Sequence, residues 1–315
     1  MPAGAQVEAD PAISSQRPAL RVLLGSGNVS GESKDGFVFA GRNYRGTFQR
    51  LDDGRIVNLV DLQAYLSSVV PGEMSSRWPA AALQAQAICA RTYVLQRSDP
   101  RRAYDVVPSQ LDQVYTGVAG ETAAAIAAVN ATAGRVLKYG AGFAQVAYSS
   151  CCGGHTEASS DAWGGAPFPY LGGVVCTSCS ASPNYRWTAN LQLENIASHF
   201  SAALAPVGDL QDLRVTAYDR SGRARGFDLV GSNGSTSVPG TAFRLTIGPR
   251  LLRSLLVTRL QRAPDGSQVL VDGGGLGHGV GLCQWGARGM AQNGAAAPAI
   301  LAFYFPGTVL GDLER

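Results

Sequence analysis

The sequence has little charge, few lysines and no long apolar run. Charged residues make up 16% of its 315 positions, and the net charge is only +3. Lysine occurs only at Lys34 and Lys138, so almost all basic residues are arginines. Because these residues form no clustered basic face, the composition gives no support to nucleic-acid binding. No segment reaches the roughly 18 consecutive apolar residues of a membrane span, so the sequence predicts no span.

The N-terminal segment also lacks the apolar stretch of a secretory signal. Residues 1–18 are small, polar and proline-bearing, and their composition predicts a flexible lead-in. An exported protein whose signal has been removed would begin in the same way. The absence of a signal therefore excludes no compartment.

Apolar and turn-forming residues, in contrast, are abundant. Hydrophobic residues make up 45% of the chain, and its 39 glycines and 16 prolines are spread through apolar segments, which indicates many turns rather than disorder. Helical and strand patterns do not alternate regularly, which favours an α+β fold with one large domain over residues 19–315. Residues 188–268 carry no motif and are a candidate for a divergent, β-rich insertion. Helices are expected at residues 60–70, 79–97, 121–133 and 191–204 and twice within 280–304, and strands at 20–24, 31–60 (as hairpins), 146–150, 213–219 and 241–247.

Glu73 is a candidate general acid. It follows Pro71 and Gly72, and we expect these residues to form a turn between two helices. Burial beside apolar helices would favour the protonated form of its carboxyl group, as a general acid at neutral pH requires. The alternative is a structural role, in which Glu73 caps a helix or forms a salt bridge with Arg77 or Arg91.

Six cysteines and one histidine include a pattern typical of zinc ligands. Cys152 and His155 form a C-x₂-H turn, and Cys176 and Cys179 form a C-x₂-C turn, as tetrahedral zinc sites require. Such a closed four-ligand site is structural. A disulfide from Cys152 to Cys176 or Cys179 is the alternative in an exported protein. The remaining cysteines are Cys89, Cys151 and Cys283. Cys89 and Cys283 either pack as small core residues or form a disulfide bridge with each other.

The densest glycine run lies near the C-terminus, at residues 273–287. Its glycines allow positive φ angles and close backbone approach around His278, Gln284 and Trp285. These side chains would suit a sugar, through hydrogen bonds and an aromatic face. The run is not a nucleotide-binding fingerprint, since no strand–GxGxxG–helix unit surrounds it. A tight structural loop with Trp285 in the core is the alternative.

Taken together, these motifs resemble the SpoIID/LytB family of peptidoglycan lytic transglycosylases and amidase enhancers. The resemblance covers roughly residues 20–312 in the same order. The segments that carry it are PGEMSSRWPAAALQAQAICARTYVL, YSSCCGGHTEASSDAWG, PYLGGVVC, GLGHGVGLCQWGARGMAQNG and ILAFYFPGT.

This resemblance implies an exported cell-envelope enzyme that cleaves glycan strands between N-acetylmuramic acid and N-acetylglucosamine and leaves 1,6-anhydro ends. Glu73 matches the proposed catalytic glutamate. Zinc at the Cys/His site would be structural, and a wall amidase is a candidate partner. The alternatives are a LytB-like protein that binds the wall and enhances an amidase without cutting, and a hydrolase with a catalytic zinc. The candidate substrate-binding residues, which lie in matched motifs, are Arg91, Tyr93, Ser149, Ser150, His278, Gln284 and Trp285.

Overall fold

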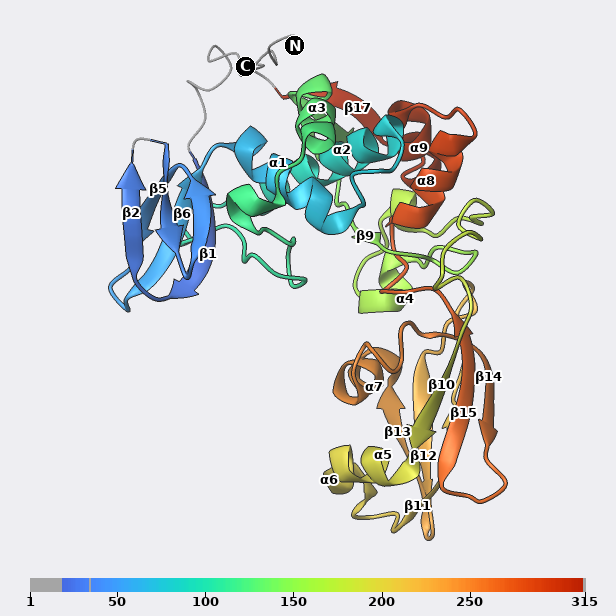
Figure 1. Ribbon diagram of the computed structural model, residues 1–315. Coiled ribbons are helices and arrows are strands. Elements are labelled where there is room, and N and C mark those ends of the chain that lie inside the picture. Colours follow the sequence, from blue (N-terminus) through green and yellow to red (C-terminus); the bar gives the residue numbers. More distant parts are fainter. Residues whose placement is uncertain (1–18, 34, 314–315) are drawn as a thin grey trace, which may run out of the picture.

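Figure 1 shows the computed structural model of the protein, which describes residues 19–33 and 35–313. The lead-in predicted at residues 1–18 lies outside this described part. Helices and small, mostly antiparallel sheets follow one another irregularly, which confirms the α+β class. The described chain consists of an N-terminal pair of sheets, a central helical unit and a second β-rich unit.

The N-terminal sheets follow the predicted hairpins. Phe37 and Phe48 bring the two sheets together, with ring centroids 5.3 Å apart. Val22 and Ile56, on neighbouring strands, are fully buried beneath them. The two three-stranded antiparallel sheets are β1 (Leu20–Ser26), β6 (Arg55–Val60) and β5 (Thr47–Arg50), and β2 (Val29–Ser33), β3 (Gly36–Phe39) and β4 (Arg42–Arg45).

The central unit is built around α2 (Ala80–Arg97), whose bounds match the predicted helix. This helix is apolar nearly all round because other helices and a strand surround it. No helix in the described ranges combines the length and apolarity needed to cross a bilayer. The neighbours of α2 include segments from both ends of the chain: α1 (Leu62–Glu73), α3 (Ala123–Ala131), α8 (Gln284–Gln292), α9 (Ala297–Tyr304), and a sheet of β17 (Val309–Asp312), β7 (Arg135–Tyr139) and β8 (Gly142–Phe143).

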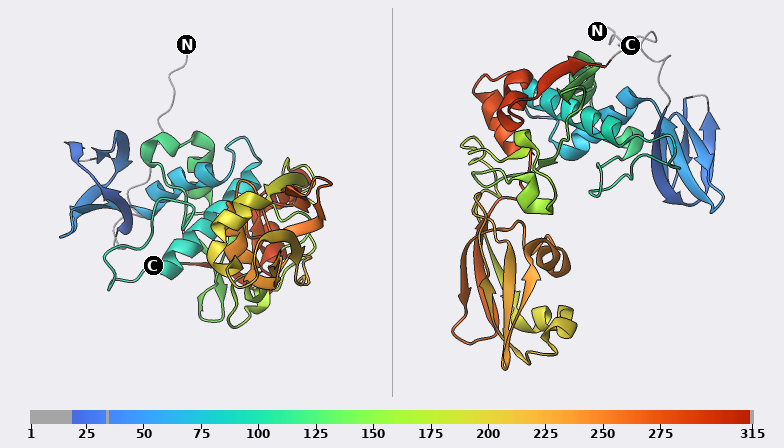
Figure 2. Two further views of the ribbon diagram at one scale, coloured as in Figure 1. Left: turned by 90° about the horizontal axis from the view of Figure 1, so that it is seen from below. Right: turned by 180° about the vertical axis from the view of Figure 1, so that it is seen from behind.

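The second β-rich unit spans residues 187–274 and has a hydrophobic core of its own. In both views of Figure 2 it lies on the opposite side of the helical unit from the N-terminal sheets. Its core runs from Trp187 to Val271, close to the segment in which the sequence shows no motif. Its elements are β10 (Trp187–Gln192), β15 (Gln268–Gly274) and β14 (Leu256–Arg262) in one sheet, β11 (Leu210–Val215), β12 (Gly226–Gly231) and β13 (Gly234–Pro239) in another, and α5 (Leu193–His199), α6 (Ser201–Leu204) and α7 (Gly240–Ile247).

Two predictions in this unit were wrong. Residues 241–247, expected as a strand, belong to helix α7. There Phe243 and Ile247, four residues apart, face the core while Leu245 is exposed, so the segment follows a helical period. The single helix expected at 191–204 begins two residues later and is divided into α5 and α6.

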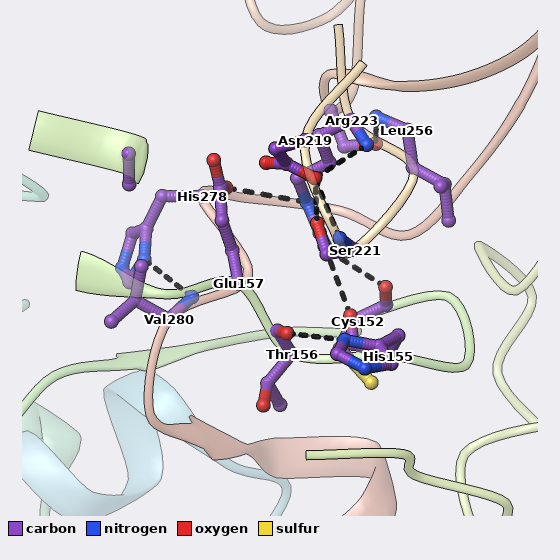
Figure 3. Close-up of polar contacts among 12 residues, drawn as sticks. Cys152, His155, Thr156, Glu157, Asp219, Ser221, Arg223, Leu256, His278 and Val280 are labelled. Atoms are coloured by element: carbon purple, nitrogen blue, oxygen red, sulfur yellow. Dashed lines mark hydrogen bonds and ion pairs between the residues drawn. The ribbon is translucent and has the colours of Figure 1, made fainter. Parts of the chain in front are cut away.

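A buried arginine joins the second β-rich unit to the central unit (Figure 3). Arg223 donates hydrogen bonds to the backbone oxygens of His155, at 2.9 Å, and Cys152, at 2.8 Å. Its Nε lies 3.4 Å from a carboxylate oxygen of Glu157, and Asp219 accepts its backbone N–H. Burial raises the pKa of Glu157 to about 8, although Arg223 acts in the opposite direction. Arg223 thus reaches two carbonyl oxygens of the central unit and lies beside a carboxyl whose pKa burial raises.

Candidate functional site

Glu73 is the last residue of helix α1. Pro71 and Gly72 continue that helix, so the turn predicted there is wrong. Gly72 is required for packing, because a Cβ atom at this position would lie 2.8 Å from the backbone oxygen of Val114. The glycine thus admits the loop that carries Val114 to the end of α1.

Two donors hold the carboxyl group of Glu73. The backbone N–H of Val114 donates to Oε1 at 3.0 Å, and the side-chain amide of Gln284 donates to Oε2 at 3.4 Å. Burial raises the pKa of Glu73, and these two hydrogen bonds offset part of the rise. In the described part of the chain, neither Arg77 nor Arg91 forms an ion pair with it. The salt-bridge alternative is therefore wrong, and burial shifts the pKa of Glu73 in the direction that a general acid requires.

Polar groups without a partner lie around this carboxyl. Gln284 also contacts Oε1 of Gln86, at 3.4 Å, while Nε2 of Gln86 has no partner among the described residues. The hydroxyl of Tyr148 is likewise buried; burial raises the pKa of this phenol, and the Glu73 charge adds to the rise. Sequence reasoning missed Gln86 and Tyr148. A glutamine inside an otherwise apolar helix was the available signal.

Three more predicted residues lie on β9 (Tyr148–Ser149), directly after it, or next to Gln284 in the chain. Ser149 is buried, with an unpartnered hydroxyl, and pairs in parallel register with Cys283 on β16 (Leu282–Cys283). The backbone oxygen of Ser150 accepts the N–H of Trp285 at 3.0 Å. The Trp285 ring packs edge-on against Trp78, with centroids 5.0 Å apart. The glycine run at residues 273–287 and the segment with Ser149 and Ser150 thus meet next to Glu73.

His278 lies toward the junction with the second β-rich unit (Figure 3). Its Nδ1 accepts the N–H of Val280 at 3.0 Å, so its Nε2 carries the proton and donates to the oxygen of Tyr148. Burial lowers the pKa of His278 to about 4, which keeps the ring neutral. The ring also packs against Trp163, at the end of helix α4 (Ser159–Trp163), with centroids 5.1 Å apart. His278 therefore positions β9 in this structure.

Arg91 and Tyr93 form hydrogen bonds with residues other than Glu73. Arg91 is fully buried, and its Nη2 donates to the oxygen of Val129 near the end of α3. This corrects the expectation that Arg91 contacts substrate, because its guanidinium is used to hold α2 and α3 together. The hydroxyl of Tyr93 donates to Asp112 at 2.9 Å.

Four buried cysteines form a compact cluster. The sulfur atoms of Cys152, Cys176, Cys179 and Cys283 all lie within 4.8 Å of one another, and those of Cys152 and Cys179 are 3.6 Å apart. Four sulfurs bound tetrahedrally to zinc at 2.3 Å would be about 3.8 Å apart. The cluster therefore fits a zinc ion, with thiolates as the ligands that zinc prefers.

The composition of this cluster corrects one predicted ligand. Cys283 takes the place expected for His155, because the pairing of β9 with β16 brings it beside Cys152. Nδ1 of His155 instead faces the backbone oxygen of Thr156 at 2.6 Å. All six cysteines are free, so neither a disulfide at Cys152 nor a Cys89–Cys283 bridge is formed.

The cluster is connected to the glutamate site through helix α8. Cys283 is the N-cap of α8, and its sulfur accepts the N–H of Gly286 at 3.3 Å. Gln284, the first residue of α8, contacts Glu73. The cysteines thus hold the end of the helix from which the amide reaches the carboxyl.

Comparisons with known proteins identify the family of the chain. The family model for Stage II sporulation protein (SpoIID) matches residues 52–139, which include Glu73. An uncharacterised protein of Brachyspira hyodysenteriae is 33% identical over 290 residues, which are 90% of this chain and 76% of that relative. The chain belongs to the SpoIID/LytB family.

Two SpoIID/LytB relatives have descriptive names. The amidase enhancer of Bacillus subtilis is 29% identical over 78% of this chain and 40% of its own length. Stage II sporulation protein D of the same species is 26% identical over 82% of this chain and 76% of its own length. A second family model, a domain of unknown function (DUF8618), matches residues 177–281, which contain the second β-rich unit of this SpoIID/LytB chain.

Proposed function

We propose that the protein acts on the bacterial cell wall as a peptidoglycan lytic transglycosylase. The observation that carries this proposal is the carboxyl of Glu73, buried, with a raised pKa, and joined to the glycine motif through Gln284. The names of the sporulation and amidase-enhancer relatives support a cell-wall role. A wall substrate also implies export to the cell envelope.

Glu73 would act first as an acid and then as a base. In the first step its proton passes to the glycosidic oxygen between N-acetylmuramic acid and N-acetylglucosamine, and the bond from C1 to that oxygen breaks. In the second, the muramyl C6 hydroxyl attacks C1 and gives its proton to the Glu73 carboxylate. The product is a 1,6-anhydro sugar, and the enzyme recovers its proton. Because the nucleophile belongs to the substrate, the second carboxylate of an ordinary glycosidase is unnecessary.

The surrounding groups supply what these two steps need. The N–H of Val114 and the amide of Gln284 stabilise the carboxylate that forms after the first transfer. Nε2 of Gln86 is buried beside them without a partner among the described residues, so it is a donor that a small polar group or a water molecule entering the site would satisfy.

A zinc ion would be held by the four cysteines. It would supply a structural cross-link between the two cysteine turns and the start of α8, since four protein ligands leave no open position for substrate. Cys283 would then keep Gln284 in contact with Glu73. If chelation lowers the melting temperature while protein that stays folded keeps full activity, a catalytic zinc is rejected.

The experiment that tests the proposal compares Glu73→Gln with wild type on purified peptidoglycan, with and without stem peptides. We expect the variant to keep its fold and to release no anhydro-muramyl products by mass spectrometry. Glu194→Gln, on an exposed helix of the second β-rich unit, is the matched control and should retain activity. A Glu73→Gln variant as active as wild type would refute the role of Glu73.

The amidase-enhancer relative supports a second candidate function. In that case the protein binds the wall and stimulates a separate amidase without cutting glycan. Binding to purified wall, with no anhydro product and with faster release of stem peptides by an added amidase, would favour this alternative.

A further inference from the structure

One arginine beside the proposed active site has no polar partner. In the described part of the chain the guanidinium of Arg288 makes no hydrogen bond and no ion pair, although the residue is partly buried. It lies over two indole rings instead, with its central carbon 4.7 Å from the centroid of Trp285 and 5.7 Å from that of Trp78. These contacts fix the position of the group and leave its N–H donors unused.

Helix α8 places this arginine one turn after Gln284, the residue that contacts the acid. Gln284 and Arg288 are four residues apart on α8, so they share one face and lie about 6 Å apart along the axis. Gln284 donates to Glu73, and Trp78 follows Glu73 by five residues. The arginine is therefore about one helical turn from the group that contacts the carboxyl.

The free donors define the chemistry of a ligand. A planar guanidinium held in one orientation favours a carboxylate, which accepts two parallel hydrogen bonds. The two indoles beside it offer apolar faces for a sugar ring. Muramic acid combines both features, because its lactyl group, on C3, ends in a carboxylate whenever no stem peptide is attached.

We propose that Arg288 binds the free lactyl carboxylate of the muramic acid whose glycosidic bond Glu73 cleaves. This inference rests on the proposed glycan substrate. A stem peptide would convert the carboxylate to a neutral amide and remove the charge that Arg288 contacts. Arg288 is thus a specificity-determining residue, and Trp78 and Trp285 hold its guanidinium in place.

Binding measurements on protein that cannot cut provide the test. In the Glu73→Gln background, Kd is measured for soluble glycan without stem peptides, for the same glycan with its lactyl carboxyls reduced to alcohols, and for glycan with stem peptides. Arg288→Gln should weaken binding of the first glycan roughly tenfold or more, the range for a charged hydrogen bond, and should leave the carboxyl-reduced glycan within about twofold. Arg288→Lys should fall between wild type and Arg288→Gln, since it keeps the charge and loses the planar fork.

Matched controls separate this effect from misfolding. Arg250→Gln, at an exposed arginine of the second β-rich unit, should change neither affinity, and the melting temperature of Arg288→Gln should stay near that of the background. Equal weakening on both peptide-free glycans, or no weakening on either, would overturn the proposal. A separate assay of wild-type cleavage tests the proposed activity. Charge-dependent binding without any cleavage would refute that activity and leave the role of Arg288 intact.

Discussion

Replacement of Cys283 by serine tests the cysteine cluster most directly. Cys283 belongs to the four-cysteine cluster of the structure and is the N-cap of α8. Serine is itself a favoured N-cap, so the change keeps the cap and removes only the thiolate. We therefore expect Cys283→Ser to lose bound zinc while α8 can still form.

The size of the effect follows from the closed geometry of the site. Structural zinc contributes about 10–16 kcal/mol of binding free energy in zinc-finger peptides, whereas a whole domain is stable by about 5–15 kcal/mol. Losing one of four ligands therefore weakens an interaction whose total is comparable with the stability of a whole domain, so the unfolding midpoint should fall clearly. His155→Ala breaks only the contact to the oxygen of Thr156 and should cost about 0.5–1.5 kcal/mol.

The assay is zinc per chain by elemental analysis, together with the urea midpoint of each variant. Wild type and His155→Ala should hold one zinc ion per chain, and Cys283→Ser should hold less, with a clearly lower midpoint. Zinc retained in Cys283→Ser and lost in His155→Ala would refute the reasoning and restore the ligand set predicted from sequence spacing. Wild type that binds no zinc under reducing conditions would refute the site itself.

Three further predictions concern the two carboxyl sites. Gln284→Leu removes a donor that favours the ionised form of Glu73, so the pKa of Glu73 should rise and the alkaline limb of the activity profile should move to higher pH; an unmoved limb would contradict the acid role. Gly72→Ala should destabilise the protein by about 1–3 kcal/mol through overpacking and lower kcat, because the new Cβ displaces the oxygen of Val114; unchanged melting and kinetics would show that the close approach is unimportant. Burial raises the pKa of Glu157 from 4.5 to about 8, so stability is retained below the lower value and is lost as pH rises toward the upper one. Wild type should lose up to about 1.4 kcal/mol per pH unit relative to Glu157→Gln, as measured by urea unfolding across that range, and parallel curves would exclude a raised pKa.

Much of the local structure could be predicted from sequence. Helix α2 begins after Pro79 and ends at Arg97 as expected, because helical periodicity and a start signal lie within one segment. The strand predicted at residues 241–247 was wrong because a short apolar run fits either a strand or a helix. Contacts with the core decided in favour of a helix.

The candidate site shows the limits of local information more clearly. The sequence indicated Glu73 and Gln284 separately, but they are 211 positions apart in the chain, and only the fold brings them together. Arg91 lies in a matched motif but is buried against α3. Its burial could not be predicted, because the motif does not show which residues surround it in space.

By itself, then, the sequence determined the α+β class, the family motifs, the position of α2 and the two cysteine turns, all of which depend on short-range spacing. The tertiary structure decided which residues meet. It placed Cys283 instead of His155 in the cysteine cluster through the pairing of β9 with β16, and it set the end of α8 against Glu73. Such long-range contacts depend on strand pairing and core packing across the whole chain, and the spacing within any one segment carries no record of them.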